Sequence, residues 1–198
     1  MSALARTRLT AEEYLAYDLA HEGKHEFVNG EMWAMAGAHT VHNLLTLNLG
    51  AGLHRRLTGS PCRVLSSDMR VLVDETGLYC YPDLTVVCGK VETAPTNPPT
   101  LKNPRMVVEV LSESTAAFDK NAKFAHYRSR TSIDTIVFVS WPERRVEAYI
   151  RDPGGWRLCE AREQQTLTIP TFDLQIPLDE VYAGMAEVLA DEAEAARE

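Results

Sequence analysis

One acidic residue lies within an otherwise apolar run near the middle of the chain. Glu109 interrupts the segment Met106–Leu111, MVVEVL, whose other side chains are all apolar. A short run of this kind is typical of a strand that is covered on both faces. A carboxylate buried there needs a cation, hydrogen-bond donors or a raised pKa, because burial disfavours its charged form. Glu109 is therefore the first candidate for a functional side chain.

A second carboxylate, that of Asp83, stands at the start of another apolar run. Asp83 follows Pro82 and precedes residues 84–88, LTVVC. Two carboxylates at matching depth on neighbouring strands can bind a hard cation and leave coordination positions for water and a phosphate group. That chemistry suits phosphodiester hydrolysis. A second interpretation stays open, in which Asp83 caps the turn after Tyr81-Pro82 and Glu109 pairs with a buried arginine or lysine.

The segment that follows Glu109 reads as a helix and carries a lysine. Asp119, Lys123 and Tyr127 are four residues apart and share one helical face, with His126 close to it. The Lys123 amine can therefore point back at the end of the strand that holds Glu109. The alternative is an exposed Asp119-Lys123 ion pair, which stabilises a helix by about 0.2–0.5 kcal/mol.

Helical and strand patterns alternate along the chain and predict an α/β (α+β) domain, with helices flanking a mixed central sheet. Asn29-Gly30 is a favoured pair for a type I′ turn and predicts an N-terminal hairpin. Residues 39–57 repeat apolar side chains at the three- and four-residue intervals of a core-facing helix. The other predicted elements are a helix at 10–20, strands at 63–73 and 79–88, a loop at 92–104, a central strand at 106–111, a helix at 114–130, a buried strand at 136–139, a C-terminal hairpin at 145–160, and a final helix from 178 that frays from about 188.

Composition excludes several classes of protein. The 198 residues suffice for one hydrophobic core, so we expect a single domain over residues 1–198. No apolar run is long enough to span a bilayer, so we expect a cytoplasmic protein with no membrane partner. The formal net charge of −8 argues against a protein that coats DNA by bulk electrostatics. It does not exclude a nuclease, because a cation held by carboxylates brings positive charge with it.

The cysteines give no sign of a metal or redox site. Cys62, Cys80, Cys88 and Cys159 are scattered, and no two have the C-x-x-C spacing of a zinc site or a redox pair. We therefore expect isolated and mostly buried thiols.

Several stretches taken together carry a resemblance to a known family. They are Tyr81-Pro82-Asp83, residues 109–115 (EVLSEST), and the trio Asp119, Lys123 and Tyr127. In these the chain resembles a bacterial family of restriction-type endonucleases that is numerous in cyanobacteria and belongs to the PD-(D/E)XK nuclease superfamily. The similarity runs from residues 26–31 (EFVNGE) to about Val139 and is most specific between Glu109 and Tyr127. It implies a restriction-endonuclease-like fold.

The resemblance also implies roles for individual residues. Asp83 and Glu109 would ligate Mg²⁺, for which Mn²⁺ is a possible substitute, and the Val110 carbonyl would be a further ligand. Lys123 would be the catalytic lysine, which orients or deprotonates the attacking water and offsets charge on the phosphate. In the superfamily's usual pattern the lysine lies two residues after the acid, where this chain has Leu111. The family shares this departure, since its lysine has moved to the following helix.

Other positions match the family's pattern as accessory residues. Glu26, Glu31 and His42 match polar positions in its N-terminal region, and one of them would complete the metal site. Asp119 and Tyr127 accompany the lysine on its helix. The alternatives are that Glu31 is only hairpin surface and that His42 is an ordinary helix-face residue.

Three hypotheses follow. The first is a magnesium-dependent endonuclease that hydrolyses DNA, and by analogy with restriction enzymes we expect it to act as a homodimer. The second is a catalytically weak nuclease-fold module that binds nucleic acid or regulates a partner, and the third is an unrelated α/β domain. Candidate contacts to the nucleic-acid backbone are Arg55, Arg56, Lys120, Arg128 and Arg130.

Overall fold

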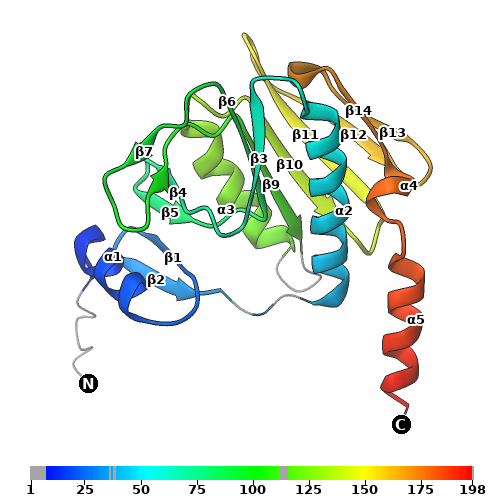
Figure 1. Ribbon diagram of the computed structural model, residues 1–198, viewed down its shortest axis with the longest axis horizontal. Coiled ribbons are helices and arrows are strands. Elements are labelled where there is room, and N and C mark those ends of the chain that lie inside the picture. The colour runs from blue at the N-terminus through cyan, green and yellow to red at the C-terminus, as the bar shows by residue number, and fades with distance from the viewer. Residues whose placement is uncertain (1–7, 36, 38, 112–115, 198) are drawn as a thin grey trace.

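The molecule has a mixed α/β architecture, as the sequence predicts (Figure 1). The computed structural model describes residues 8–35, 37, 39–111 and 116–197, without the side chains of residues 116–119. Within these residues the strands form two six-stranded sheets and a two-stranded hairpin. The second six-stranded sheet was not anticipated from the sequence.

The main sheet is mixed and contains the strand that carries Glu109. This strand, β9, runs parallel to β10 on one side and antiparallel to β6 on the other. All of its residues are buried, which confirms the prediction of a central strand covered on both faces. In spatial order the sheet consists of β12 (Gly155–Arg162), β11 (Arg145–Asp152), β10 (Thr135–Ser140), β9 (Met106–Leu111), β6 (Leu84–Cys88) and β3 (Cys62–Ser66).

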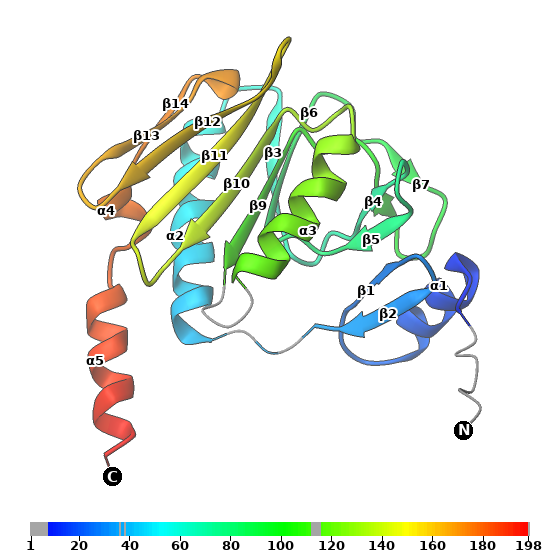
Figure 2. The same ribbon diagram turned by 180° about the vertical axis from the view of Figure 1, so that it is seen from behind.

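Two helices cover the two faces of this sheet. α2 (Thr40–Leu57) lies in front of it in Figure 1, and α3 (Ala116–Ser129) lies in front of it in Figure 2, which is the opposite view. Val108 and Val110 belong to the core cluster that contains the apolar stripe of α2, whereas Val107 belongs to the cluster that contains Tyr127 of α3. Because side chains alternate along a strand, Glu109 faces α3.

The second sheet lies beside the first and receives the N-terminal hairpin (Figure 1). Asn29 and Gly30 have φ of 54° and 85°, as a type I′ turn requires. Helix α1 (Ala11–Ala20) begins with a capping box between Thr10 and Glu13 and packs Tyr14 against the sheet. The strands, in spatial order, are β2 (Glu31–Ala34), β1 (His25–Val28), β5 (Leu78–Cys80), β4 (Val71–Val73), β8 (Thr100–Leu101) and β7 (Thr93–Ala94).

Two predicted strands are each broken into two. The strand expected at 63–73 becomes β3 and β4, which lie in different sheets, with a turn closed by a hydrogen bond from Met69 N to Ser66 O. The strand expected at 79–88 becomes β5 and β6 and is interrupted at Tyr81-Pro82-Asp83, where proline lacks the donor that a ladder needs. The loop expected at 92–104 also contains β7 and β8.

The C-terminal segment departs furthest from the prediction. The hairpin of β11 and β12 is confirmed, but a second hairpin and a 3-10 turn follow it. The expected single helix is divided at Gly184, whose φ of 76° is left-handed, and the stretch expected to fray is helical to Ala195. These elements are β13 (Thr166–Ile169), the 3-10 turn Pro170–Phe172, β14 (Leu174–Pro177), α4 (Leu178–Val181) and α5 (Met185–Ala195). No helix among the described residues is both long and apolar enough to cross a membrane.

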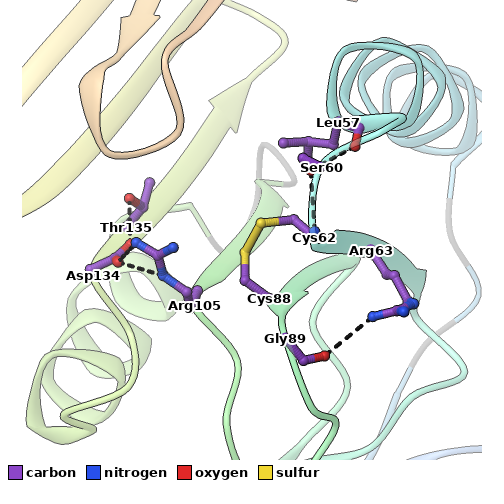
Figure 3. Close-up of a disulfide and its surroundings, with 9 residues drawn as sticks. All are labelled: Leu57, Ser60, Cys62, Arg63, Cys88, Gly89, Arg105, Asp134 and Thr135. Atoms are coloured by element: carbon purple, nitrogen blue, oxygen red, sulfur yellow. Dashed lines mark hydrogen bonds and ion pairs between the residues drawn. A yellow bond between two sulfur atoms is a disulfide. The ribbon is translucent and has the colours of Figure 1, made fainter.

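The expectation of four isolated thiols is wrong, because Cys62 and Cys88 form a disulfide (Figure 3). The two residues lie opposite each other where edge strand β3 pairs with β6. The register of the two strands cannot be read from cysteine spacing, so this contact could not be predicted from local patterns. Cys80 and Cys159 are free thiols, the first of them buried.

Replacing both Cys62 and Cys88 by serine removes this cross-link from the sheet edge. The bonded cysteines are 26 residues apart. Closing a loop of that length restricts the unfolded chain, so the double variant should lose roughly 2–4 kcal/mol of unfolding free energy. Urea titrations measure the loss, and Cys159→Ser is the matched control that should unfold like the wild type. Equal midpoints for wild type and double variant would contradict the prediction.

Candidate active site

The register of the main sheet brings Asp83 and Glu109 side by side. Leu84 of β6 pairs with Val108 of β9 in antiparallel orientation. The residue before Leu84 and the residue after Val108 are therefore neighbours. Asp83 is 8% exposed and Glu109 is 6% exposed. Two nearly buried carboxylates thus lie close together near the end of the central strand.

The partners of Glu109 come from α3. Tyr127 Oη donates a hydrogen bond to Oε1 at 2.5 Å, and Lys123 Nζ donates one to Oε2 at 3.0 Å. Lys123 and Tyr127 are one helical turn apart, so a single face of α3 supplies both donors. The strand carboxylate is held at both of its oxygens.

Asp83 is held from two other directions. Its Oδ2 accepts a hydrogen bond from the Val110 backbone N–H at 2.7 Å, and His42 Nε2 of α2 lies 3.2 Å from the same oxygen. These contacts run across the sheet to β9 and α2, so the alternative in which Asp83 serves only to cap its own turn does not describe them. Within the described part of the chain, no hydrogen bond reaches Oδ1.

A third carboxylate reaches this group from the second sheet. Glu26 of β1 places Oε1 3.1 Å from Lys123 Nζ, within ion-pair distance but without hydrogen-bond alignment. The amine therefore lies between Glu26 on one sheet and Glu109 on the other. This arrangement joins the two sheets at the site.

The charges of the group are unbalanced. Burial raises the pKa of Glu109 to about 7, and repulsion from Asp83 and Glu26 adds to the effect, while Lys123 opposes it. Burial disfavours the ammonium form of Lys123, yet the charges of Glu109 and Glu26 raise the pKa of Lys123 above its usual value, so the amine stays protonated. The hydrogen bond to Asp83 raises the pKa of His42. Added positive charge would relieve the repulsion among the carboxylates.

The donor set suits a hydrated hard cation better than a closed metal cage. The described residues contain no group of three or more histidine, cysteine, aspartate or glutamate side chains arranged to enclose an ion. Mg²⁺ keeps several of its waters and commonly takes only one or two carboxylates from the protein. Asp83 and Glu109 supply that pair, and Glu26 Oε1 and His42 Nδ1 are buried atoms without a hydrogen-bond partner among the described residues. The residues present therefore fit Mg²⁺.

The remaining predicted site residues have different positions. Glu31 is exposed on β2, and no hydrogen bond or ion pair of the described residues joins it to the group. The side chain of Asp119 lies outside the described residues. Leu111, at the position where the superfamily usually has its lysine, is a buried core residue.

The buried environment also includes residues that sequence reasoning missed. Cys80 places its thiol 3.5 Å from the hydroxyl of Tyr127. Glu147 of β11 is a further buried acid, and Lys120 Nζ lies 2.5 Å from its carboxylate. The apolar neighbours Val146 and Ala148 were the available signal for its burial.

Most of the cations proposed for backbone contacts already have carboxylate partners. Arg55 and Arg56 pair with Glu180, and Lys120 pairs with Glu147. Arg130 pairs with Asp74 and Glu75. These contacts lower the positive charge that the surface offers to a phosphate backbone.

A family model described as "Uma2: Putative restriction endonuclease" matches residues 11–179. The chain belongs to the Uma2 family. Two uncharacterized proteins of Synechocystis sp. (strain PCC 6803) are similar to this Uma2 chain. The first is 29% identical over 180 residues, which cover 90% of this chain and 94% of the relative. The second is 36% identical over 162 residues, which cover 81% and 92%.

A solved structure has a similar fold. It is the crystal structure of a putative nuclease belonging to DUF820 from Anabaena variabilis, which aligns with a TM-score of 0.69 over 88% of this Uma2 chain and 98% of that chain. The identity is 12%, so this likeness concerns the fold alone. Membership of the family excludes the third hypothesis, an unrelated α/β domain.

The raised pKa of Glu109 predicts a specific pH dependence of stability in metal-free protein. With the folded pKa near 7 and the usual value at 4.5, the folded state keeps a proton that the unfolded chain has lost. The retained proton contributes to the unfolding free energy in full below about pH 4.5, and this contribution declines as the pH rises to 7. The Glu109→Gln variant has no proton to lose at this position, so its stability should not show this decline. The wild type should lose roughly 2–3 kcal/mol relative to Glu109→Gln across that window. Urea titrations in EDTA from pH 4.5 to 8 measure the difference, and a constant difference would contradict it.

Proposed function

We propose that the chain is a magnesium-dependent endonuclease that hydrolyses phosphodiester bonds in DNA. The observation that supports this most directly is the contact of the Lys123 amine, at 3.0 Å, with the buried carboxylate of Glu109, beside a second buried carboxylate, Asp83. An acid pair with an amine is a donor set suited to phosphodiester hydrolysis. The description of the family, "Putative restriction endonuclease", names the same class of reaction.

Asp83 and Glu109 would hold the ion, and the Val110 carbonyl would be a further ligand. The Val110 N–H already binds Asp83, so the backbone at this point lies against the acid pair. When bound, Mg²⁺ supplies a Lewis acid for the phosphate and a water of lowered pKa.

Lys123 would act on the water and on the phosphate. Its raised pKa keeps it cationic, so its main role is to orient the water and to offset negative charge that develops on the phosphate oxygens. Tyr127 donates a hydrogen bond to Glu109 and so fixes that carboxylate, and Glu26 Oε1 lies 3.1 Å from the Lys123 amine. His42 positions Asp83.

A second candidate function is a nuclease-fold module with little turnover that binds nucleic acid or regulates a partner. Tight binding to DNA normally uses lysine and arginine side chains that are free to contact phosphates. This second function is favoured because four of the candidate cations already pair with carboxylates, namely Arg55, Arg56, Lys120 and Arg130. Cleavage and metal titration separate the two functions. A homodimer, in which each copy would cut one strand, is part of the first proposal.

Lys123→Met should lower cleavage of plasmid and oligonucleotide DNA in Mg²⁺ or Mn²⁺ by 100-fold or more, about the loss that follows removal of one donor to developing negative charge. Lys102→Met is the control, because it removes a lysine that pairs with a carboxylate, Asp74, away from the group around Glu109. The control should keep cleavage activity at temperatures where it is folded. Equal losses in the two variants would contradict the role of Lys123, and wild-type protein without any cleavage would favour the second function.

Calorimetric titration tests the metal site without relying on turnover. Mg²⁺ or Mn²⁺ should bind the wild type, and Asp83→Asn or Glu109→Gln should weaken binding at least 10-fold, because each removes one anionic ligand. Glu147→Gln is the control, since it neutralises a buried carboxylate that faces Lys120 outside the acid pair. Unchanged binding in Asp83→Asn and Glu109→Gln would place the ion elsewhere.

A further inference from the structure

Trp33 is exposed although tryptophan has a large apolar side chain. It lies on β2, the edge strand of the second sheet, and is 48% exposed. The other two tryptophans, Trp141 and Trp156, are only partly exposed and stack against neighbouring side chains. Within the described part of the chain, the half-exposed Trp33 indole makes no hydrogen bond and no ring contact.

The register of the hairpin places Trp33 beside the candidate active site. Trp33 lies directly opposite Glu26 in the antiparallel pair of β1 and β2. Residues opposite each other point to the same face, with Cβ atoms about 5 Å apart. Glu26 Oε1 is itself 3.1 Å from Lys123 Nζ. Trp33 is therefore the direct cross-strand neighbour of a side chain that contacts the amine.

The other face of the hairpin is turned inward. Phe27 belongs to the small core cluster around Tyr14 of α1, and Met32 packs against that cluster. Glu26 and Trp33 alternate with these residues and so point the opposite way. Val28, on the same face as Glu26, packs against the cluster that contains Tyr127. The face that carries Trp33 is thus the one directed towards α3 and the site.

Electrostatics alone supplies little affinity for nucleic acid near this site. Glu26 and Glu109 contact the one amine, Asp83 lies beside Glu109, and the chain carries a formal net charge of −8. Stacking of a base on an aromatic ring does not depend on charge and tolerates any sequence, because every base has a π-face. A ring beside an acidic centre can therefore supply affinity that arginine and lysine do not supply here.

We propose that Trp33 stacks on a base next to the scissile phosphate, so that the preferred substrate contains an unpaired nucleotide, as in single-stranded or frayed DNA. A base within a duplex is stacked on its neighbours and does not offer a free face. This proposal rests on the proposed function and adds the form of nucleic acid that the site accepts. Another occupant of the exposed ring, a second copy of the chain added at the β2 edge, is an outcome of the test.

The test compares binding by the full chain and two substitutions of one residue. Fluorescence anisotropy of a labelled single-stranded oligonucleotide and of the matching blunt duplex is measured in Ca²⁺ to limit turnover. Trp33→Ala should weaken single-strand binding roughly 5- to 100-fold. Trp33→Phe keeps a ring and should stay within about 3-fold of the wild type, because stacking needs only an aromatic face. Leu47→Ala, at a 70% exposed apolar residue on α2, is the control for general loss of apolar surface.

The outcomes separate this proposal from the function on which it rests. Stacking is supported if Trp33→Ala binds the single strand more weakly while Trp33→Phe and Leu47→Ala bind it like the wild type. The mass of Trp33→Ala by light scattering and its thermal stability should then be unchanged. If Trp33→Ala binds and cleaves like the wild type, the stacking role is overturned and the nuclease proposal is left intact. A halved mass in Trp33→Ala overturns it in favour of a contact between copies. Wild-type protein that neither binds nor cuts any oligonucleotide overturns both proposals.

Discussion

The burial of the Glu109 carboxylate is the constraint on which the arrangement of the helices and sheets depends. A charge inside the central strand is tolerated only when its partners are fixed close to it, and removing one partner of such a pair typically costs about 3–5 kcal/mol. Lys123 and Tyr127 of α3 are the partners of the Glu109 carboxylate. The same helix makes a second contact of this kind, from Lys120 to Glu147 on β11. Phe138 of β10 lies opposite both acids in the register of the sheet, and Lys120 Nζ lies 5.8 Å from the centre of its ring. The position of α3 therefore follows from charge neutralisation as well as from apolar packing.

A second buried network anchors the N-terminal part of the chain close to the same place. Arg70, 1% exposed, binds Asp18 of α1 at 2.7 Å, and the Tyr81 hydroxyl donates to the same carboxylate oxygen at 2.6 Å. Tyr81 stands two residues before Asp83, so the network holds the turn from which the acid projects. The second sheet in turn supplies Glu26. The acid pair, the amine and the third carboxylate thus come from parts of the chain that are distant in sequence.

Local patterns predicted what local physics determines. The helix at 10–20, the Asn29-Gly30 turn, the apolar stripe of α2 and the buried run of β9 each follow from interactions between near neighbours, and each was found. The burial of Glu109 indicated that a cation, hydrogen-bond donors or a raised pKa was needed, and helical spacing indicated Lys123 as a candidate partner. The break of two long apolar stretches into strands of different sheets depends on long-range pairing and could not be predicted. The disulfide and the approach of Glu26 to the amine depend on the same pairing, so they were missed or left open.

The Lys123 amine that contacts Glu109 comes from helix α3, while position 111 on the strand is an apolar leucine. This affects how sites that combine an acid and a lysine can be found from sequence. A search pattern that requires acid and lysine two residues apart would pass over this chain, although the two groups touch. An ammonium group can reach a strand carboxylate from a neighbouring helix as well as from the strand itself, because the contact depends on where the two charged atoms lie and not on their separation along the chain. Sites of this kind are therefore recognised by comparing where charged atoms meet in space.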